Sequence, residues 1–189
     1  MRFVSRAGIV VSAAVLIAAL ASSIGTVAAA LDKSAINEQV ASTLDRFYAL
    51  NENNKYLAQN AAGVLVFPKV EKAGVGIGGE HGTGALLKDG KTIGYYSVSG
   101  ASVGLTLGMS SHSEVIIFQT PTALDKFIKS GDWSIGADTS VAVVKNGAGG
   151  VYDSETLKKP VIAFVFGEKG LMGDASLQGG KITRLAAAD

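Results

Sequence analysis

The first regular pattern of the chain, after its N-terminal region, is helical. Between residues 32 and 50, apolar residues recur every three or four positions, and polar residues fill the positions between them. This spacing places the apolar side chains on one face of a helix. The pattern predicts an amphipathic helix over residues 32–50, with Asp32 or Ser34 as its capping residue. The apolar positions are Ile36, Val40, Leu44, Phe47 and Leu50.

After a second helix, the pattern changes from helical to alternating. This shorter helix is predicted over Lys55–Ala62 and is ended by Gly63. Val64–Pro68 is an apolar run closed by proline, which is typical of a buried strand. In residues 74–85 and again in residues 93–109, most glycines and other small residues take even positions, and bulkier residues take odd ones. Alternation with a period of two predicts a strand in each stretch.

The two glycine-rich stretches are predicted to pair as a hairpin about Asp89-Gly90, a frequent two-residue turn. The uncharged run Thr92–Ser111 is long enough for a membrane helix, but its serines, tyrosines and β-branched residues favour a strand. Repeated glycine weakens a strand, so its use here indicates close approach of another backbone or sharp curvature. We therefore expect a strongly curved sheet or barrel, with a helix laid against or into its glycine-rich face.

The rest of the chain combines short strands with one helix. The helix is predicted to begin at Thr120-Pro121, with Thr120 as the cap, and to end at Ser130-Gly131. The fold class predicted from all these elements is α+β: a curved, glycine-rich, antiparallel or barrel-like sheet with an N-terminal amphipathic helix and one short central helix. The other predicted strands are Glu114–Gln119, Trp133–Val144, Val161–Phe166, and a hairpin of Leu171–Gln178 with Lys181–Leu185 about Gly179-Gly180.

Residues 1–30 have the features of a secretory signal peptide. Arg2 and Arg6 precede an uncharged apolar run, and small residues ending at Ala30 follow it. Cleavage after Ala30 would leave residues 31–189 as a single domain, periplasmic or secreted. The alternative is a retained membrane anchor, because the uncharged run is long enough to reach across a bilayer. The chain has no cysteine, which excludes disulfides and a lipid-carrying N-terminal cysteine.

The charge of the chain argues against nucleic-acid binding. The whole chain has 17 basic and 16 acidic residues, and the predicted cleavage removes two arginines but no acid, which leaves a net charge of −1. Proteins that bind nucleic acid through charge usually carry a basic excess. Attraction to an anionic partner must therefore come from a local patch.

Three motifs suggest chemistry, and each has a simpler structural explanation. Gly74–Gly79 matches a dinucleotide-binding pattern, but no helix is predicted to open on it. Gly100–Gly104 matches the nucleophile elbow of serine hydrolases, but Ser102 lies inside an alternating stretch. His81 and His112 lack further ligands at metal spacing, so we interpret them as ordinary surface or turn histidines. The sequence implies no metal, no cofactor and no catalytic residue, and a hydrolase that uses Ser102 is a remote alternative.

Basic residues gather near the predicted N-terminal helix and on the central helix. An amphipathic helix with basic neighbours can lie at a membrane interface, with its apolar face in the acyl boundary and its cations on the headgroups. The simpler alternative, which the pattern alone favours, is that the helix packs on the sheet. The candidate lipid-binding residues are Lys33, Arg46, Lys69, Lys72, Lys126 and Lys129.

Several blocks along the chain resemble the signature of SYLF domains, in the same order and spacing. The resemblance covers about residues 36–185, nearly the whole predicted mature chain. It implies non-enzymatic binding of anionic phospholipid, such as a phosphoinositide headgroup, through basic residues and the N-terminal helix; some members also bind actin. The blocks are Ala62–Val70, Lys72–Gly74, Gly78–Gly84, Ser102–Gly108, Gly136–Val143 and Lys169–Gly179.

The predicted function is therefore the binding of anionic phospholipid, or of a membrane surface, by an exported domain that is not an enzyme. The resemblance implicates Lys33, Arg46, Lys69 and Lys72 as the first candidates for contact with the headgroup. The alternative is a structural or protein-interaction module of the cell envelope, whose partner would be another envelope protein.

Overall fold

The computed structural model describes residues 31–134, 140–145, 153–170 and 180–186, with the backbone alone at residue 76 and residues 102–107. The predicted signal peptide and the predicted strand Leu171–Gln178 lie outside these ranges. The residues described from Asp32 onward belong to one unit. No helix among the described residues has both the length and the apolar content needed to cross a bilayer.

Two helices come first in this unit. α1 spans Lys33–Leu50, in agreement with the predicted helix, and its cap is Asp32, whose carboxylate accepts a hydrogen bond from a main-chain amide at 3.0 Å. α2 spans Glu52–Gln59. It begins earlier than predicted because Asn51 caps it, accepting a hydrogen bond from a main-chain amide at 2.9 Å, and it also ends earlier, at Gln59.

A long hairpin forms most of the sheet. β1 spans Gly63–Lys88 and β2 spans Lys91–Phe118, and the two strands pair antiparallel along their length. The turn is the predicted one, with Asp89 at φ 51° and Gly90 at φ 72°. Gly63 begins β1 instead of ending a helix. The two short apolar strands predicted beside the glycine-rich stretches are the ends of β1 and β2, not separate elements.

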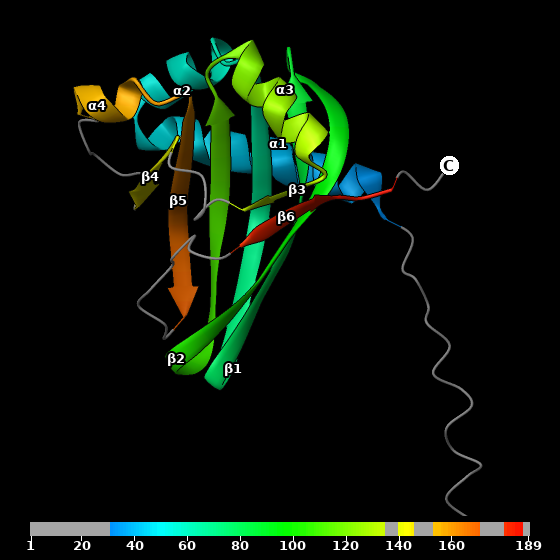
Figure 1. Ribbon diagram of the computed structural model, residues 1–189, viewed down its shortest axis with the longest axis vertical. Helices are drawn as coiled ribbons and strands as arrows, with labels where there is room; N and C mark the ends of the chain where they lie inside the picture. Colours follow the sequence, from blue (N-terminus) through cyan, green and yellow to red (C-terminus); the bar gives the residue numbers. More distant parts are fainter. Residues whose placement is uncertain (1–30, 135–139, 146–152, 171–179, 187–189) are drawn as a thin grey trace, which may run out of the picture. The chain divides into compact units, whose positions relative to one another are not determined.

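The hairpin folds over on itself, and its glycines permit this. Figure 1 shows both strands bending back at one end of the sheet, and β1 has a register shift there, between Val75 and Ile77. Further along, a Cβ atom at Gly84 would overlap the carbonyl oxygen of Val66, because the two halves of β1 pass each other closely. The expected reasons for the glycines, curvature and close backbone approach, are both confirmed.

The helix on the glycine-rich inner face is α3, which spans Pro121–Ser130. Its N-terminal cap is Thr120 and its C-terminal cap is Gly131, whose φ is 69°, as predicted. A Cβ atom at Gly63 would lie only 2.8 Å from the Leu124 side chain, so glycine also lets this helix approach the sheet.

The other strands extend the sheet from β2, with β6 paired to its first arm, before the bend, and β5 to its second arm, after the bend. The described strands form one sheet in the order β3-β6-β2-β5-β4, with β1 beside β2. The pairs are antiparallel except β4 with β5, which is parallel. The fold class is α+β, with a mostly antiparallel sheet curled into a half-barrel (Figure 1), as predicted. The elements are β3 (Asp132–Ser134), β4 (Val141–Lys145), α4 (Ser154–Leu157), β5 (Val161–Gly170) and β6 (Lys181–Arg184).

One strand prediction is wrong. Residues Trp133–Val144 were expected to form a single strand, but β3 and β4 are separate, because β3 pairs with β6 while β4 pairs with β5. The short helix α4, begun by Asp153, was not predicted.

Two hydrophobic cores lie on opposite faces of the same sheet. The inner core lies within the folded hairpin, where Phe67 and Phe118 pack with Phe127 of α3. The outer core lies beneath α1, where Val40 and Phe47 are buried among sheet residues that include Phe164. Helix α1 therefore packs on the sheet, as the simpler of the two sequence alternatives expected.

Candidate functional site

The six candidate basic residues do not form one patch. The structure brings Arg46 and Lys69 together beside α1, and it places Lys33 in a separate pocket near the start of the same helix. Lys72 is buried inside the curled sheet. Lys126 and Lys129 lie exposed on α3.

Arg46 and Lys69 line a groove of about 340 Å³ between α1 and the Pro68 corner of β1. Apart from these two cations, its walls are mainly neutral polar groups that can donate hydrogen bonds to an anion, but Glu38 adds one negative charge at the helix side. The remaining lining residues are Gln39, Ser42, Thr43 and Pro68.

The guanidinium of Arg46 is held in place by its neighbours. Its Nη2 donates to Thr43 Oγ1 at 2.9 Å and to Ser113 Oγ at 3.2 Å. Ser113 Oγ donates in turn to the Pro68 carbonyl at 2.7 Å, so a polar bridge joins α1 to the corner. The guanidinium also lies 5.9 Å from the ring centre of Phe166. An arginine already oriented in this way loses little freedom when it binds an anion.

Lys69 is less constrained than Arg46. Its Nζ lies 2.6 Å from Glu71 Oε1, but both side chains are more than half exposed. Exposed ion pairs of this kind contribute little, about 0–1 kcal/mol, because water and salt screen them. The ammonium can therefore exchange Glu71 for an anion in the groove at small cost.

Lys33 lies in a pocket of about 250 Å³ with a second cation, Arg184 of β6, which the sequence analysis missed. Tyr95 and Ile93 of β2 form part of the wall. The pairing of β6 with the first arm of β2 brings Arg184 here, and this pairing is not visible from local pattern. The neighbouring Asn37 donates to Tyr95 Oη at 3.0 Å and joins α1 to β2.

Lys72 belongs to a charged cluster that the sequence analysis also missed. The cluster lies on the inner face near the bend and consists of the buried residues Lys72, His112 and Glu114 with the partly buried Glu80. His112 is only 4% exposed, so its interpretation as a surface or turn residue is wrong, and its Nε2 lies 2.7 Å from Glu114 Oε1. Lys72 cannot contact a membrane surface from this position.

The cluster has unusual electrostatics. Burial raises the pKa of Glu80, and the nearby Glu114 carboxylate raises it further, while Lys72 and His112 act in the opposite direction. Glu114 Oε2 is buried without a hydrogen-bond partner in the described part of the chain. Among the described residues, no three His, Cys, Asp or Glu side chains are arranged so that they could hold a metal ion.

The position of Ser102 does not fit a nucleophile elbow. Its backbone lies within β2, opposite Gly78 of β1. An elbow needs a sharp turn from a strand into a helix, which β2 does not make at this point.

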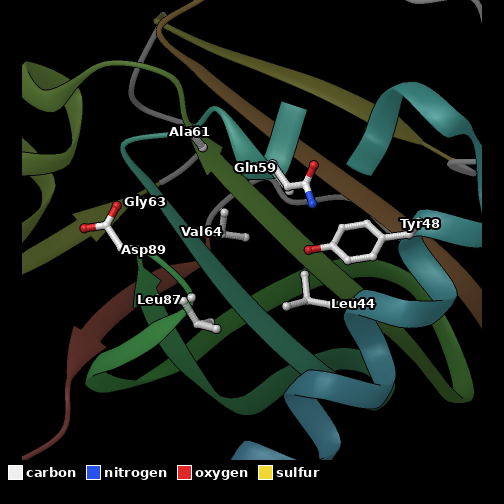
Figure 2. Close-up of a pocket in the computed structure, with 10 residues that line it drawn as sticks. Leu44, Tyr48, Gln59, Ala61, Gly63, Val64, Leu87 and Asp89 are labelled. Carbon is white, nitrogen blue, oxygen red and sulfur yellow. The ribbon is translucent and has the colours of Figure 1, made fainter. Parts of the chain in front are cut away.

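A further pocket, of about 280 Å³, lies between the two N-terminal helices and the hairpin turn. Figure 2 shows Leu44 and Tyr48 of α1 reaching toward Val64 and Leu87 of the sheet, with Asp89 at one side. Burial raises the pKa of Tyr48, so its hydroxyl stays protonated. The pocket is mixed in character and has no basic residue in its lining, so an anionic headgroup fits the Arg46 groove better.

Comparison with known families bears on the second half of the chain. Residues 99–189 match the family model described as Ysc84: Las17-binding protein actin regulator. The matched region begins within β2 and includes α3 and the strands that follow it. No curated protein matches the chain.

Proposed function

Because the chain carries a Ysc84/SYLF family domain over residues 99–189, we propose that it binds anionic phospholipid without catalysing a reaction. The family is known for lipid binding, and its members are generally non-enzymatic binding domains. The groove lined by Arg46 and Lys69 is the observation that carries the proposal for this chain. Both residues come from elements that precede the matched region.

In this proposal a phosphate of the headgroup occupies the groove. The Arg46 guanidinium donates to it in a charge-assisted contact, and the Lys69 ammonium leaves Glu71 to do the same. Hydroxyl groups of the groove supply further donors. Because the groove is open to water, the attraction weakens as salt is added.

Vesicle cosedimentation tests the proposal. The chain is produced with its own N-terminal segment, and the form recovered is defined by mass spectrometry. It should pellet with vesicles that contain anionic phospholipid and remain in solution with zwitterionic ones, at low salt. Arg46→Gln with Lys69→Gln should lower the affinity on the order of tenfold, because two charge-assisted contacts are lost.

Lys126→Gln with Lys129→Gln is the matched control, since it removes the same charge from α3. The control should bind as the parent chain does. Equal losses of vesicle affinity in the two double variants would show that binding depends on overall charge and not on the groove. Failure of the parent chain to pellet at low salt would reject lipid binding itself.

A protein-interaction module is the second candidate. The description of the matched family names protein binding, and β4 pairs only with β5 among the described strands, which leaves an edge with Val143 45% exposed. If the protein acts in this way, it should bind a protein partner stably and show no preference for anionic vesicles. The Val143→Lys variant should no longer bind that partner in a pull-down.

We further propose that the protein is exported and cleaved near Ala30. The charged, apolar and small-residue order of residues 1–30 supports this proposal. N-terminal sequencing of protein recovered from the periplasm or medium tests it, and an N-terminus at Met1 would indicate a retained segment.

A further inference from the structure

Large apolar side chains stand exposed at the bend of the β1–β2 hairpin. Val75, Ile77 and Met109 are 79%, 70% and 68% exposed, the highest values among the large aliphatic residues described as exposed. They belong to one region, because Val75 and Ile77 flank the register shift of β1 and Met109 pairs with Ala73. Clustered apolar exposure of this kind marks an interaction surface.

The bend carries no charge. Residues 73–79 of β1 and residues 99–111 of β2 contain no acidic or basic residue. Their main-chain groups pair across the hairpin through most of this region. Removal of the bend from water would therefore desolvate no charge and few unpaired main-chain groups, which favours entry into lipid.

Charges begin directly behind the bend. Glu71 and Lys169 both pair with Ser111 in the sheet, and Lys69 follows on the outer face. An uncharged end followed by a mixed charged collar complements the acyl boundary and headgroup layer of a bilayer. This charge distribution favours lipid over a second copy of the chain.

Helix α1 cannot supply the apolar contact in this fold. Val40 and Phe47 are 2% and 0% exposed in the outer core, so their exposure to lipid would require the helix to leave the sheet. The bend offers comparable side chains with no rearrangement.

We propose that the exposed apolar side chains at the bend of the hairpin, Val75, Ile77 and Met109, insert into the outer acyl region of a phospholipid bilayer. This inference rests on the proposed lipid binding and identifies the part of the protein that enters the membrane. The groove beside α1 selects anionic headgroups, and the bend adds apolar contact.

The absence of cysteine allows a direct test. Ile77→Cys carries one environment-sensitive fluorophore at the bend. Val143→Cys carries the same fluorophore on β4, at another exposed apolar position. Each labelled chain is mixed with vesicles that contain anionic phospholipid, with and without a nitroxide quencher on the acyl chains, and binding is measured in parallel by cosedimentation.

The label at position 77 should brighten severalfold on vesicle binding and be quenched by the acyl-chain nitroxide, while the label at position 143 stays unchanged. Unlabelled Ile77→Asp should bind vesicles more weakly, on the order of tenfold, since burial of an isoleucine is lost. Val143→Asp should bind as the parent chain does.

Other outcomes overturn the inference in distinguishable ways. Vesicle binding without a response at position 77, or with equal responses at both positions, rejects insertion of the bend and leaves lipid binding intact. A response at position 77 that grows with protein concentration in the absence of vesicles identifies a second copy as the occupant. Failure of every labelled and parent chain to pellet rejects the proposed function as well.

Discussion

At the residue scale, the glycines of β1 differ sharply in how much space surrounds them. A Cβ atom at Gly84 would overlap the carbonyl oxygen of Val66, and a backbone atom cannot move aside as a flexible side chain can. At Gly79 the nearest heavy atom to such a Cβ is the Gly100 carbonyl oxygen, 3.8 Å away, which is ordinary contact. The structure therefore requires glycine at position 84, whereas position 79 has room for a larger side chain.

Gly84→Ala is expected to lower the free energy of unfolding by about 2–3 kcal/mol, because the added carbon forces the two halves of β1 apart. Gly79→Ala should change it by less than about 0.5 kcal/mol. Thermal or urea unfolding of both variants measures this difference. Equal stability of the two variants would mean that the close passage of β1 over itself is not as described.

Glu80 gives a pH prediction at the same scale. Its pKa is raised in the folded protein, chiefly by burial and then by Glu114, so the folded chain holds this proton more tightly than the unfolded chain does. The contribution of Glu80 to stability is therefore most favourable below the ordinary pKa of 4.5 and declines as the pH rises through the higher folded value.

Glu80→Gln should consequently stabilise the protein more at neutral than at acid pH, relative to the parent chain. Melting temperatures of both proteins across this range provide the measurement. Glu71→Gln, an exposed carboxylate on the outer face, is the control and should show no such trend. A constant difference between Glu80→Gln and the parent at all pH values would contradict the prediction.

At the element scale, local signals in the sequence were accurate where local chemistry decides the structure. Helix caps and tight turns depend on interactions within a few residues. The two predicted caps, Asp32 and Thr120, and the predicted turn at Asp89-Gly90 are all found in the structure. The start of α2 was misplaced because Asn51 serves both as the end of one helix and as the cap of the next.

The faces of β1 were harder to predict than its existence. Leu65 and Phe67 face the inner core, but a register shift before Val70 exchanges the two faces of the strand. Lys72 consequently points inward, into the charged cluster, although simple alternation leaves it as a surface candidate. A register shift depends on the partner strand, so one strand's own pattern does not reveal it.

At the scale of the whole molecule, contacts between segments distant in the sequence determine which basic residues come together, and local sequence patterns do not predict these contacts. Arg184 reaches Lys33 only because β6 joins the first arm of β2. Arg46 and Lys69 meet because α1 crosses the sheet beside the Pro68 corner. The alternation of small and bulky residues predicted the class of fold, and the resemblance to SYLF domains gave a lipid-binding expectation, but neither indicated which basic residues share a groove.

The two hydrophobic cores have a consequence for cooperativity. They are separated by a single layer of strands, and β2 contributes side chains to both, with Phe118 on one side and Val115 on the other. Loosening either core frees β2 and removes one wall of the other, so the domain should denature in a single transition. Trp133, the only tryptophan and a member of the inner core, should therefore report the same midpoint by fluorescence as far-ultraviolet circular dichroism reports for the entire backbone.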